Sequence, residues 1–470
     1  MKTYNRILLA GSALMLFAIA SCKNSPTSVN VSAPQRQVGQ SITSDTLSGA
    51  IKGTLLTGKT YYFKNDIQVN AGDTLLLQNN VHLIALPPAD PTQAATPGPQ
   101  ISVFGTFISL GAKGAENWIT VPDDRKTYLG LDSGLWGGIQ FDANSGDCII
   151  KWTHIEYVGG PSGPNTAIVP NHDHRFAIWY HNVNGHVILE DSWIHGSVDD
   201  PVRVSGGHIS MFRNTWEHCG SDGGDGPNIK SGVTGDIAYN LFIGNCTNGA
   251  KLSNLGGASV QTDVNIYNNT FVNCGFRTVE AGRAGSTNIE QGARGTEYNN
   301  LIVNCKTGFR LVGNPVADTA HTYYDYQYYY GQSDSIVLGF YPNYLGGIAV
   351  PKPHDVAGPT GANDPMFVNY NVNLIDFNSF HPFEPQPDNV EPPYMNLVAA
   401  DASHVWNFRL KPGSPCIGKG TTTVPADAQA GGVQIPMPNN VPIGGDFGAD
   451  QQGLGADMGC YQSDGSGNQH

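Results

Sequence analysis

The sequence predicts an all-β protein in which short parallel strands stack into a solenoid. Four similar phrases follow one another: FRNTWEHC ending at Cys219, AYNLFIGNC at Cys246, IYNNTFVNC at Cys274 and EYNNLIVNC at Cys305. They recur at intervals within the roughly 20 to 50 residues that mark stacked repeat architectures. The 58 Gly and 30 Pro residues, with only 14% charged residues, are typical of a turn-rich β protein rather than a helical bundle.

Each phrase places an Asn two residues before a large apolar residue. The pairs are Asn214 with Trp216, Asn240 with Phe242, Asn269 with Phe271, and Asn300 with Ile302. Polar and apolar residues alternate here, and Gly and Asn separate the phrases, which predicts strands and turns. The simplest arrangement is a right-handed parallel β-helix with one coil per repeat and coils about 4.8 Å apart. Stacked Asn amides could then bond to one another.

The four Cys residues of these phrases are expected to form a buried ladder of free thiols. Stacked neighbours would also lie within disulfide distance, and an exported protein can be oxidised, so that alternative stays open. No Cys-x-x-Cys motif occurs, which disfavours a zinc or redox site.

Residues 1–21 have the form of an export signal. Lys2 and Arg6 precede an apolar run that is too short to span a membrane. The run ends Ile19-Ala20-Ser21-Cys22, which resembles a bacterial lipoprotein cleavage box. That resemblance implies a lipid on Cys22 and a location at the outer membrane or cell surface. Residues 22–45 are polar and rich in Ser and Pro, which predicts a flexible tether.

The formal net charge of −14 disfavours a nucleic-acid partner. No other apolar stretch is long enough to cross a membrane, so the lipid is the expected membrane contact. The protein is expected to be a monomer.

Residues 46–345 are assigned to the β-helix itself. Trp136-Gly137-Gly138-Ile139 and Ile155-Glu156-Tyr157-Val158-Gly159 lie in its first half. These phrases resemble those of a group of surface β-helix lipoproteins, which implies fold and location but no particular activity. Tyr residues crowd residues 321–331, where they could stack on sugar rings or cap the solenoid.

Residues 346–470 are assigned to a C-terminal closing segment. Asp364-Pro365-Met366-Phe367-Val368, Gly413-Ser414-Pro415-Cys416 and Asp457-Met458-Gly459-Cys460 resemble the closing segments of many secreted bacterial β-helix proteins. In those proteins small residues often stand where Cys416 and Cys460 do, which makes a disulfide here plausible. The open end of a β-helix is an unpaired sheet edge that needs a cover. The segment is predicted to cap that end, with residues 463–470 frayed.

One position on the strand that follows each repeat is charged in five successive coils. These residues are Arg203, Lys230, Lys251, Glu280 and Arg310. Their neighbours are mostly apolar and would point inward, since side chains alternate along a strand. The charges therefore predict an outward row, mostly basic in an acidic protein. A solvated face, with Glu280 neutralising its neighbours, is the simpler alternative.

Two adjacent turns before this row are acidic. One contains Asp199 and Asp200, and the next contains Asp222 and Asp225 in a Gly-rich insertion. Stacked turns would bring the four carboxylates together, where they repel unless protonated or bridged by a cation. Carboxylates on a Gly-rich turn suit Ca²⁺. Asp and Gly are also good turn formers, which is the alternative explanation.

The same stretch resembles family 9 pectate lyases, which are right-handed β-helices. Those enzymes carry Asp-Asp-Gly-x-Asp on one coil and Asn-Gly-Phe-Lys-Leu on a later one. This chain has Asp222-Gly223-Gly224-Asp225 and Asn248-Gly249-Ala250-Lys251-Leu252, so Gly223 and Ala250 depart from the pattern. The resemblance implies that Asp222, Asp225 and one of Asp199 and Asp200 bind Ca²⁺, and that Lys251 is the catalytic base.

The combined hypothesis is a Ca²⁺-dependent lyase that cleaves an acidic polysaccharide by β-elimination. Lys251 would take the proton beside a uronate carboxylate, with Lys230 as the second catalytic candidate. Nearby positive charge would lower the lysine pKa. The candidate substrate contacts are Arg203, Arg310 and Glu280, of which the two arginines could hold carboxylates.

Three other hypotheses remain. The first is a non-catalytic, adhesin-like glycan-binding protein, and the second is a structural surface protein. The third is a hydrolase with a carboxylate pair, Glu280 with Asp236 or Glu290. A lyase needs converging carboxylates close to a lysine, whereas an adhesin needs only an exposed row with aromatic residues nearby.

Overall fold

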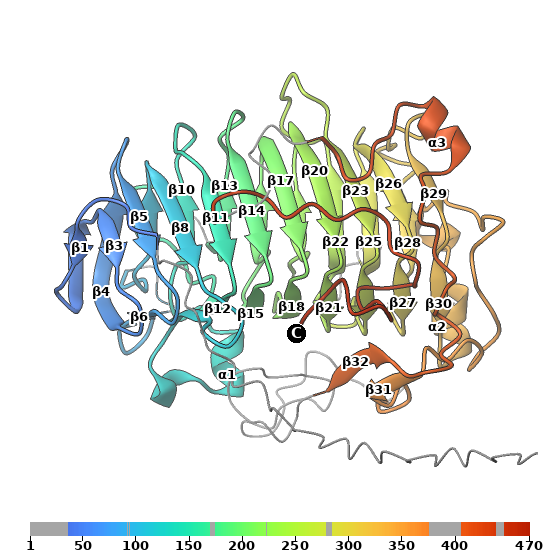
Figure 1. Cartoon of the computed structure of the whole chain (residues 1–470), viewed down its shortest axis with the longest axis horizontal. Coiled ribbons are helices and arrows are strands. Elements are labelled where there is room, and N and C mark those ends of the chain that lie inside the picture. Colours follow the sequence, from blue (N-terminus) through green and yellow to red (C-terminus); the bar gives the residue numbers. More distant parts are fainter. Residues whose placement is uncertain are drawn as a thin grey trace, which may run out of the picture. The chain divides into compact units, whose positions relative to one another are not determined.

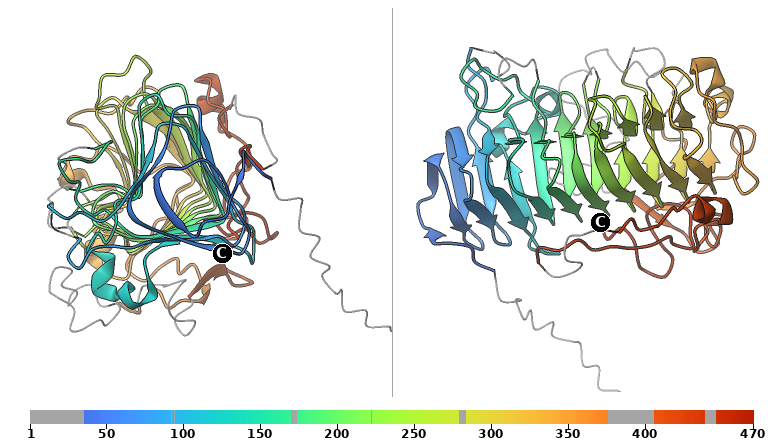
Figure 2. Two further views of the ribbon diagram at one scale, coloured as in Figure 1. Left: turned by 90° about the vertical axis from the view of Figure 1, so that its left-hand side faces the viewer. Right: turned by 90° about the horizontal axis from the view of Figure 1, so that it is seen from above.

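The computed structural model describes residues 36–470 apart from 92, 94, 170–173, 222, 279–283, 376–405 and 439–445. The expected export signal and Cys22 lie outside the described residues, as do Asp222 and Glu280. Residues Arg36–His470 form one unit, whose parallel strands stack coil upon coil (Figures 1 and 2). The predicted all-β solenoid, a parallel β-helix, is confirmed.

Three faces of parallel strands surround the core. The first, sheet A, has eleven strands: β1 (Ser41–Ile42), β3 (Gly53–Leu55), β5 (Thr74–Leu77), β8 (Thr106–Leu110), β11 (Cys148–Lys151), β14 (His186–Glu190), β17 (Gly207–Phe212), β20 (Val233–Ala238), β23 (Asp263–Tyr267), β26 (Arg294–Tyr298) and β29 (Tyr323–Asp325). The other two faces, sheets B and C, join into one 19-stranded sheet because β4 (Thr60–Val69) pairs with strands of both.

Sheets B and C follow the same coil order. Besides β4, sheet B contains β2 (Thr46–Ala50), β7 (Ile101–Val103), β10 (Ile139–Phe141), β13 (Ile178–Tyr180), β16 (Val202–Val204), β19 (Pro227–Ile229), β22 (Asn248–Ser253), β25 (Gly285–Glu290) and β28 (Phe309–Leu311). Sheet C contains β6 (His82–Ala85), β9 (Asn117–Thr120), β12 (Thr153–Val158), β15 (Trp193–Ser197), β18 (Thr215–Cys219), β21 (Leu241–Ile243), β24 (Thr270–Val272), β27 (Leu301–Val303) and β30 (Tyr328–Tyr330).

The core is a set of apolar ladders, because the strand register stacks like residues on one another. On sheet B the inward ladder is Val204, Ile229, Leu252, Ile289 and Leu311, all buried. On sheet C, Trp216, Phe242 and Phe271 stack with ring centroids 5.8 and 4.7 Å apart. Each coil therefore buries its apolar residues mainly against its neighbours.

The predicted Asn ladder is present. Nδ2 of Asn214 donates to Oδ1 of Asn240 at 3.0 Å, and Asn240 donates in the same way to Asn269 at 3.0 Å. Asn269 donates to Asn300 at 3.1 Å. The same Oδ1 atoms also accept the backbone N–H of the preceding Asn. Each amide oxygen thus satisfies two buried donors on the coil before it.

The cysteines that the structure describes are free thiols. Cys219, Cys246, Cys274 and Cys305 are buried and unpaired by disulfides, as expected of a thiol ladder. Cys416 and Cys460 are also free and buried, so the disulfide suggested by resemblance is not formed. Burial raises the pKa of each of these two thiols to about 12. They act as protonated, packed side chains.

The last part of the closing segment lies elsewhere than predicted, whereas Val356, near the start of the segment, pairs with Tyr328 of the last strand, β30. Residues 446–470 run along the flank of the solenoid as far as sheet A strands β11 and β14, instead of capping its end (Figure 1). The hydroxyls of Tyr239 and Tyr267 donate to the carbonyls of Gly453 and Gln452 at 2.5 and 2.6 Å. Near β14, the backbone N–H of Asp450 donates to Glu190 Oε1 at 2.6 Å.

The reason for this path is an apolar strip on the outward faces of sheets A and C. Tyr239 and Tyr267 belong to a buried cluster that includes Met458, Cys460 and Tyr461 of the closing segment. Outward residues of the earlier coils, Leu76, Ile108, Ile149 and Ile188, pack around Ala449. Exposing such a strip would cost about 25 cal/mol for each Å² of apolar surface, so the segment covers it.

Residues 463–470, predicted to be frayed, are held in place. Asn468 is buried, and its Nδ2 donates to the carbonyl of Tyr239 at 3.2 Å. The ring of His470 stacks on Trp193 with centroids 3.6 Å apart. The prediction that this end is frayed is therefore wrong, because its contacts with the solenoid are buried even though most of its residues are polar.

Short elements close the last coil and cover one face. Beyond β30 lie α2 (Asp334–Leu338) and η2 (Asn343–Leu345), and Phe340 between them stacks on Tyr329 with centroids 4.8 Å apart. The buried Tyr328, Tyr329 and Tyr330 thus belong to the cap of the solenoid. The remaining elements are η1 (Asp123–Arg125) and α1 (Tyr128–Leu131) beside sheet C, α3 (Ala426–Ala430), and the antiparallel pair β31 (Phe367–Asn369) and β32 (Asn407–Leu410).

Candidate functional site

The outward side chains of sheet B form a row that differs from the predicted one. In register along the stack stand Trp179, Arg203, Asn228, Lys251, Asn288 and Arg310. Arg203, Lys251 and Arg310 are therefore placed as predicted. Asn228 and Asn288 hold the positions predicted for Lys230 and Glu280, and Lys230 lies outside the row.

The error came from counting residues after each Cys, because the connecting turns differ in length. Aligning the strands on their inward Ile, Leu or Val residue gives the observed register: Ile229 follows Asn228, and Ile289 follows Asn288. This alternation is visible in the sequence and could have found both Asn residues. Lys230 directly follows β19, and Glu280 lies outside the described residues.

Asp200 is the buried centre of the first acidic turn. Arg203 donates to Asp200 Oδ2 through Nη2 at 2.6 Å and through Nε at 3.0 Å, and Asn228 Nδ2 donates to the same oxygen at 2.7 Å. The backbone N–H of Asp225 donates to Asp200 Oδ1 at 2.8 Å. Burial, followed by the charge of Asp199, raises the pKa of Asp200 to about 6, although Arg203 opposes that rise.

Asp225 is the buried centre of the second acidic turn. Thr247 Oγ1 and Asn248 Nδ2 both donate to its Oδ1 at 2.6 Å, and Lys251 Nζ lies 3.6 Å from its Oδ2. Burial raises the pKa of this carboxyl, but Lys251 and the two hydrogen bonds outweigh burial, so the pKa lies below its ordinary value. The two acidic turns therefore stack, as predicted.

These carboxylates already have protein partners, which bears on the expected Ca²⁺ site. In the described part of the chain, no group of three or more His, Cys, Asp or Glu side chains is arranged to hold a metal ion. Asp200 and Asp225 are each bonded by several donors, and Asp222 lies outside the described residues. The expected Ca²⁺ site therefore stays a prediction.

The two candidate lysines differ in their surroundings. Lys251 is buried, and its Nζ lies 3.2 Å from Glu290 Oε1 as well as near Asp225. Lys230 is half-buried, and its ammonium makes no hydrogen bond or ion pair with another described residue. Burial, followed by the charges of Lys251 and Arg203, lowers the pKa of Lys230. Lys230 is therefore the better placed of the two to act as a neutral base.

The ends of the row have different roles. Arg310 donates to the carbonyl of Leu345 through Nε and Nη2 at 3.1 and 2.7 Å and to Asn288 Oδ1 at 3.0 Å, so it holds the capping segment. At the other end, Trp179 is half-buried, and its ring stacks on His181 with centroids 4.4 Å apart.

The hydrolase hypothesis pairs Glu280 with Asp236 or Glu290, and the structure describes only the last two residues. Asp236 lies on sheet A and accepts the backbone N–H of Met437 at 2.9 Å, under the closing segment. Glu290 ends β25 on sheet B and pairs with Lys251. Because Glu280, the partner of either carboxylate in that hypothesis, lies outside the described residues, the pair stays a prediction.

Buried histidines line the outward face of sheet C. His195 Nδ1 lies 3.5 Å from Glu217 Oε2, and His218 Nε2 lies 3.2 Å from Asp132 Oδ1. Burial lowers the pKa of each His to about 4. The cavity beside His195 measures about 10 Å³, which is at the limit for one water molecule. This cluster is therefore packing rather than a ligand site.

Comparisons of the chain with family models, with curated proteins and with solved structures found no match. Among the described helices, none is both long enough and apolar enough to cross a membrane. The functional argument accordingly rests on the fold and on the geometry of the sheet B row.

Proposed function

We propose that the protein binds an acidic polysaccharide along the sheet B row and cleaves it by β-elimination beside a uronate carboxylate. The observation that carries the proposal is Lys230, a half-buried lysine of lowered pKa beside the guanidinium of Arg203. Amines of lowered pKa in a cationic setting suit proton abstraction. Export and lipid attachment at Cys22 belong to the same proposal.

Recognition would use the exposed parts of the row. Arg203 uses Nε and Nη2 for Asp200, and its Nη1 makes no hydrogen bond to any described residue. The Arg203 side chain is 28% exposed, which leaves it able to contact a substrate carboxylate. Trp179, on the neighbouring strand, offers a ring face for a sugar. Strand spacing of about 4.8 Å presents these contacts along an extended polymer.

In the reaction, the neutral Lys230 amine takes the proton from the carbon that bears the uronate carboxylate. The bond from the adjacent carbon to the glycosidic oxygen then breaks, and a carbon–carbon double bond forms. The leaving sugar keeps the electron pair of the broken bond and takes a proton from solvent water. Arg203 holds the carboxylate and stabilises the charge that develops on it. Asp200, clamped by Arg203 and Asn228, orients the guanidinium.

A calcium ion, if bound at the acidic turns, would acidify the proton by drawing charge from the uronate carboxylate. The residues that would hold it are Asp199, Asp222 and Asp225. Asp222 and Asp225 belong to the Gly-rich turn, and the negative charge of all three carboxylates favours such a cation.

The second candidate function is glycan binding without cleavage. Lys251 and Arg310 fit this function, because their side chains are held by protein partners and add positive charge to the row without a role in proton transfer. An adhesin-like protein would need only the cationic row and Trp179.

The test is to incubate the protein with pectate, alginate and glycosaminoglycans and to follow the ultraviolet absorbance of unsaturated uronate. We expect absorbance to rise with at least one polymer and to stop rising when EGTA removes Ca²⁺. Binding of a polymer without any rise in absorbance would support the second candidate. If no polymer binds and no polymer gives a rise in absorbance, both candidate functions are refuted.

A further inference from the structure

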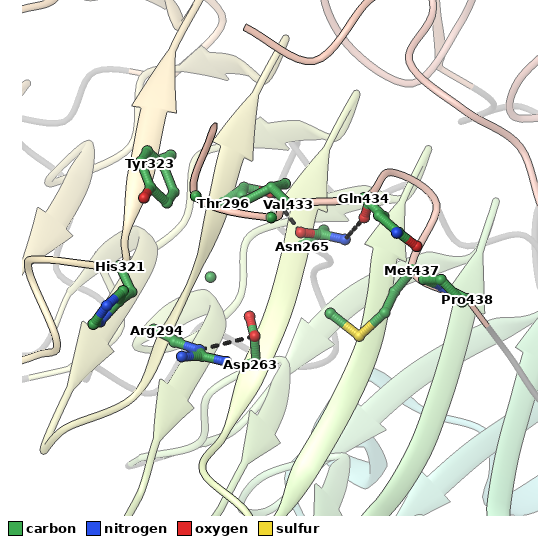
Figure 3. A pocket seen from close by; sticks show the side chains of 13 residues that line it. Asp263, Asn265, Arg294, Thr296, His321, Tyr323, Val433, Gln434, Met437 and Pro438 are labelled. Atoms are coloured by element: carbon green, nitrogen blue, oxygen red, sulfur yellow. Dashed lines mark hydrogen bonds and ion pairs between the residues drawn. The ribbon is translucent and has the colours of Figure 1, made fainter. Parts of the chain in front are cut away.

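A second cavity lies on another face of the molecule, between sheet A and the closing segment. It has a volume of about 180 Å³, and Figure 3 shows the side chains that line it. Strands β23 and β26 provide Asp263, Asn265, Arg294 and Thr296, and Tyr323 of β29 stands beside them. The opposite wall is the segment 431–438. The sheet B row contributes no residue to this cavity.

The floor of this cavity is fixed by hydrogen bonds. Asn265 Nδ2 donates to Asp236 Oδ1 at 2.8 Å and to the carbonyl of Gln434 at 3.0 Å. Thr296 Oγ1 donates to Asn265 Oδ1 at 2.8 Å. The backbone N–H of Met437, in the wall, also donates to Asp236 Oδ2 at 2.9 Å, so the wall is joined to the floor. The cavity is therefore formed before any ligand arrives.

The mouth of the cavity carries a balanced pair of charges. Arg294 Nε donates to Asp263 Oδ2 at 2.8 Å, and the two side chains are 35% and 27% exposed. The other N–H groups of Arg294 and the second oxygen of Asp263 make no hydrogen bond within the described part of the chain. The mouth of the cavity therefore offers hydrogen-bond donors from Arg294 and an acceptor from Asp263. A ligand with a net charge would be repelled by one of these two side chains.

We propose that this cavity binds a single neutral sugar ring or a polyol of similar size. Its volume of about 180 Å³ is below the roughly 300–1,000 Å³ of sites for drug-sized ligands, so a small ligand suits it better. Hydroxyl groups both donate and accept, so they fit Asp263 and Arg294 together, with the Thr296 hydroxyl behind them. Tyr323, Val433 and Met437 supply apolar surface for the C–H faces of the ring.

The experiment is titration calorimetry of the full chain with glucose, galactose, mannose, inositol and galacturonate. At least one neutral probe is expected to bind, with an affinity at least tenfold higher than that of galacturonate. The Asp263→Asn and Thr296→Val variants should each weaken that binding tenfold or more. Preference for galacturonate, or binding of no neutral probe, would overturn the proposal.

The matched control is Asp73→Asn. Asp73 is 23% exposed and pairs with Lys52 at 3.1 Å, much as Asp263 pairs with Arg294, but it lies near the first coils. This variant should bind like the wild type, and equal losses in both Asp variants would contradict the assigned site. Thermal unfolding of each variant separates a lost contact from a lost fold. Should Asp263→Asn not fold, Thr296→Val decides alone.

Discussion

At the scale of single residues, the sequence predicted contacts where the repeat is regular and failed where it is interrupted. The Asn ladder and the outward positions of Arg203 and Lys251 follow directly from strand alternation. Lys230 was misplaced because the insertion that precedes β19 hides the register. Its lowered pKa depends on charges from three coils, which no local pattern reveals.

The Asn ladder predicts a large effect for Asn240→Ala. The change removes the acceptor for Nδ2 and the backbone N–H of Asn214, which are both buried. Each unsatisfied donor costs about 1–3 kcal/mol, so the free energy of unfolding should fall by roughly 2–5 kcal/mol in urea titration. Asn184→Ala on the exposed surface is the control, with a change within about 0.5 kcal/mol. Equal effects of the two changes would contradict the ladder's role.

Glu297 predicts a pH-dependent stability. It pairs in register with Ile266, is fully buried, and burial raises the pKa of its carboxyl to about 8, with Thr287 opposing that rise. Between about pH 4.5 and 8 the folded protein keeps a proton that the unfolded chain loses. The free energy of unfolding therefore falls as pH rises through this window.

Glu297→Gln removes this pH dependence. The variant should gain stability over the wild type as pH rises from 5 to 9, by about 3–5 kcal/mol in all. Urea unfolding of both proteins at several pH values measures the difference. If the difference in the free energy of unfolding between the two proteins does not change with pH, Glu297 is not held protonated in the folded protein.

At the scale of elements, the strands were predictable and the position of the closing segment was not. Strand boundaries follow local alternation, whereas the segment binds residues more than two hundred positions away, such as Tyr239 to Gly453. Its apolar residues are few and irregularly spaced. Only the three-dimensional stack shows that Tyr239, Tyr267 and Tyr298 make one strip that needs a cover.

Met458→Ala tests this packing of the closing segment. Met458 is fully buried in the cluster over sheets A and C, so its truncation should lower the free energy of unfolding by about 2–5 kcal/mol. Met366, in the same C-terminal part of the chain, is 39% exposed. Met366→Ala should therefore change stability by less than about 1 kcal/mol. A small effect at Met458 would argue for a loosely attached segment.

At the scale of the whole molecule, the solenoid was predictable because every coil repeats the same constraints. The chemistry that we propose concentrates where that repetition breaks, at the two acidic turns and the lysine that follows them. The insertion after Cys219 gathers Asp200, Asp225, Arg203 and Lys230 on one face. A sequence pattern identified the turns, but which lysine serves as base depends on burial and ion pairing.

The most direct test compares polymer cleavage by Lys230→Ala with cleavage by Lys64→Ala, which changes an exposed lysine of the first coils. General-base catalysis is worth about 10²–10⁴-fold, so Lys230→Ala should lower kcat by at least about 100-fold with its fold intact, whereas Lys64→Ala should match the wild type. Undiminished kcat in folded Lys230→Ala would contradict the assignment of Lys230 as the base.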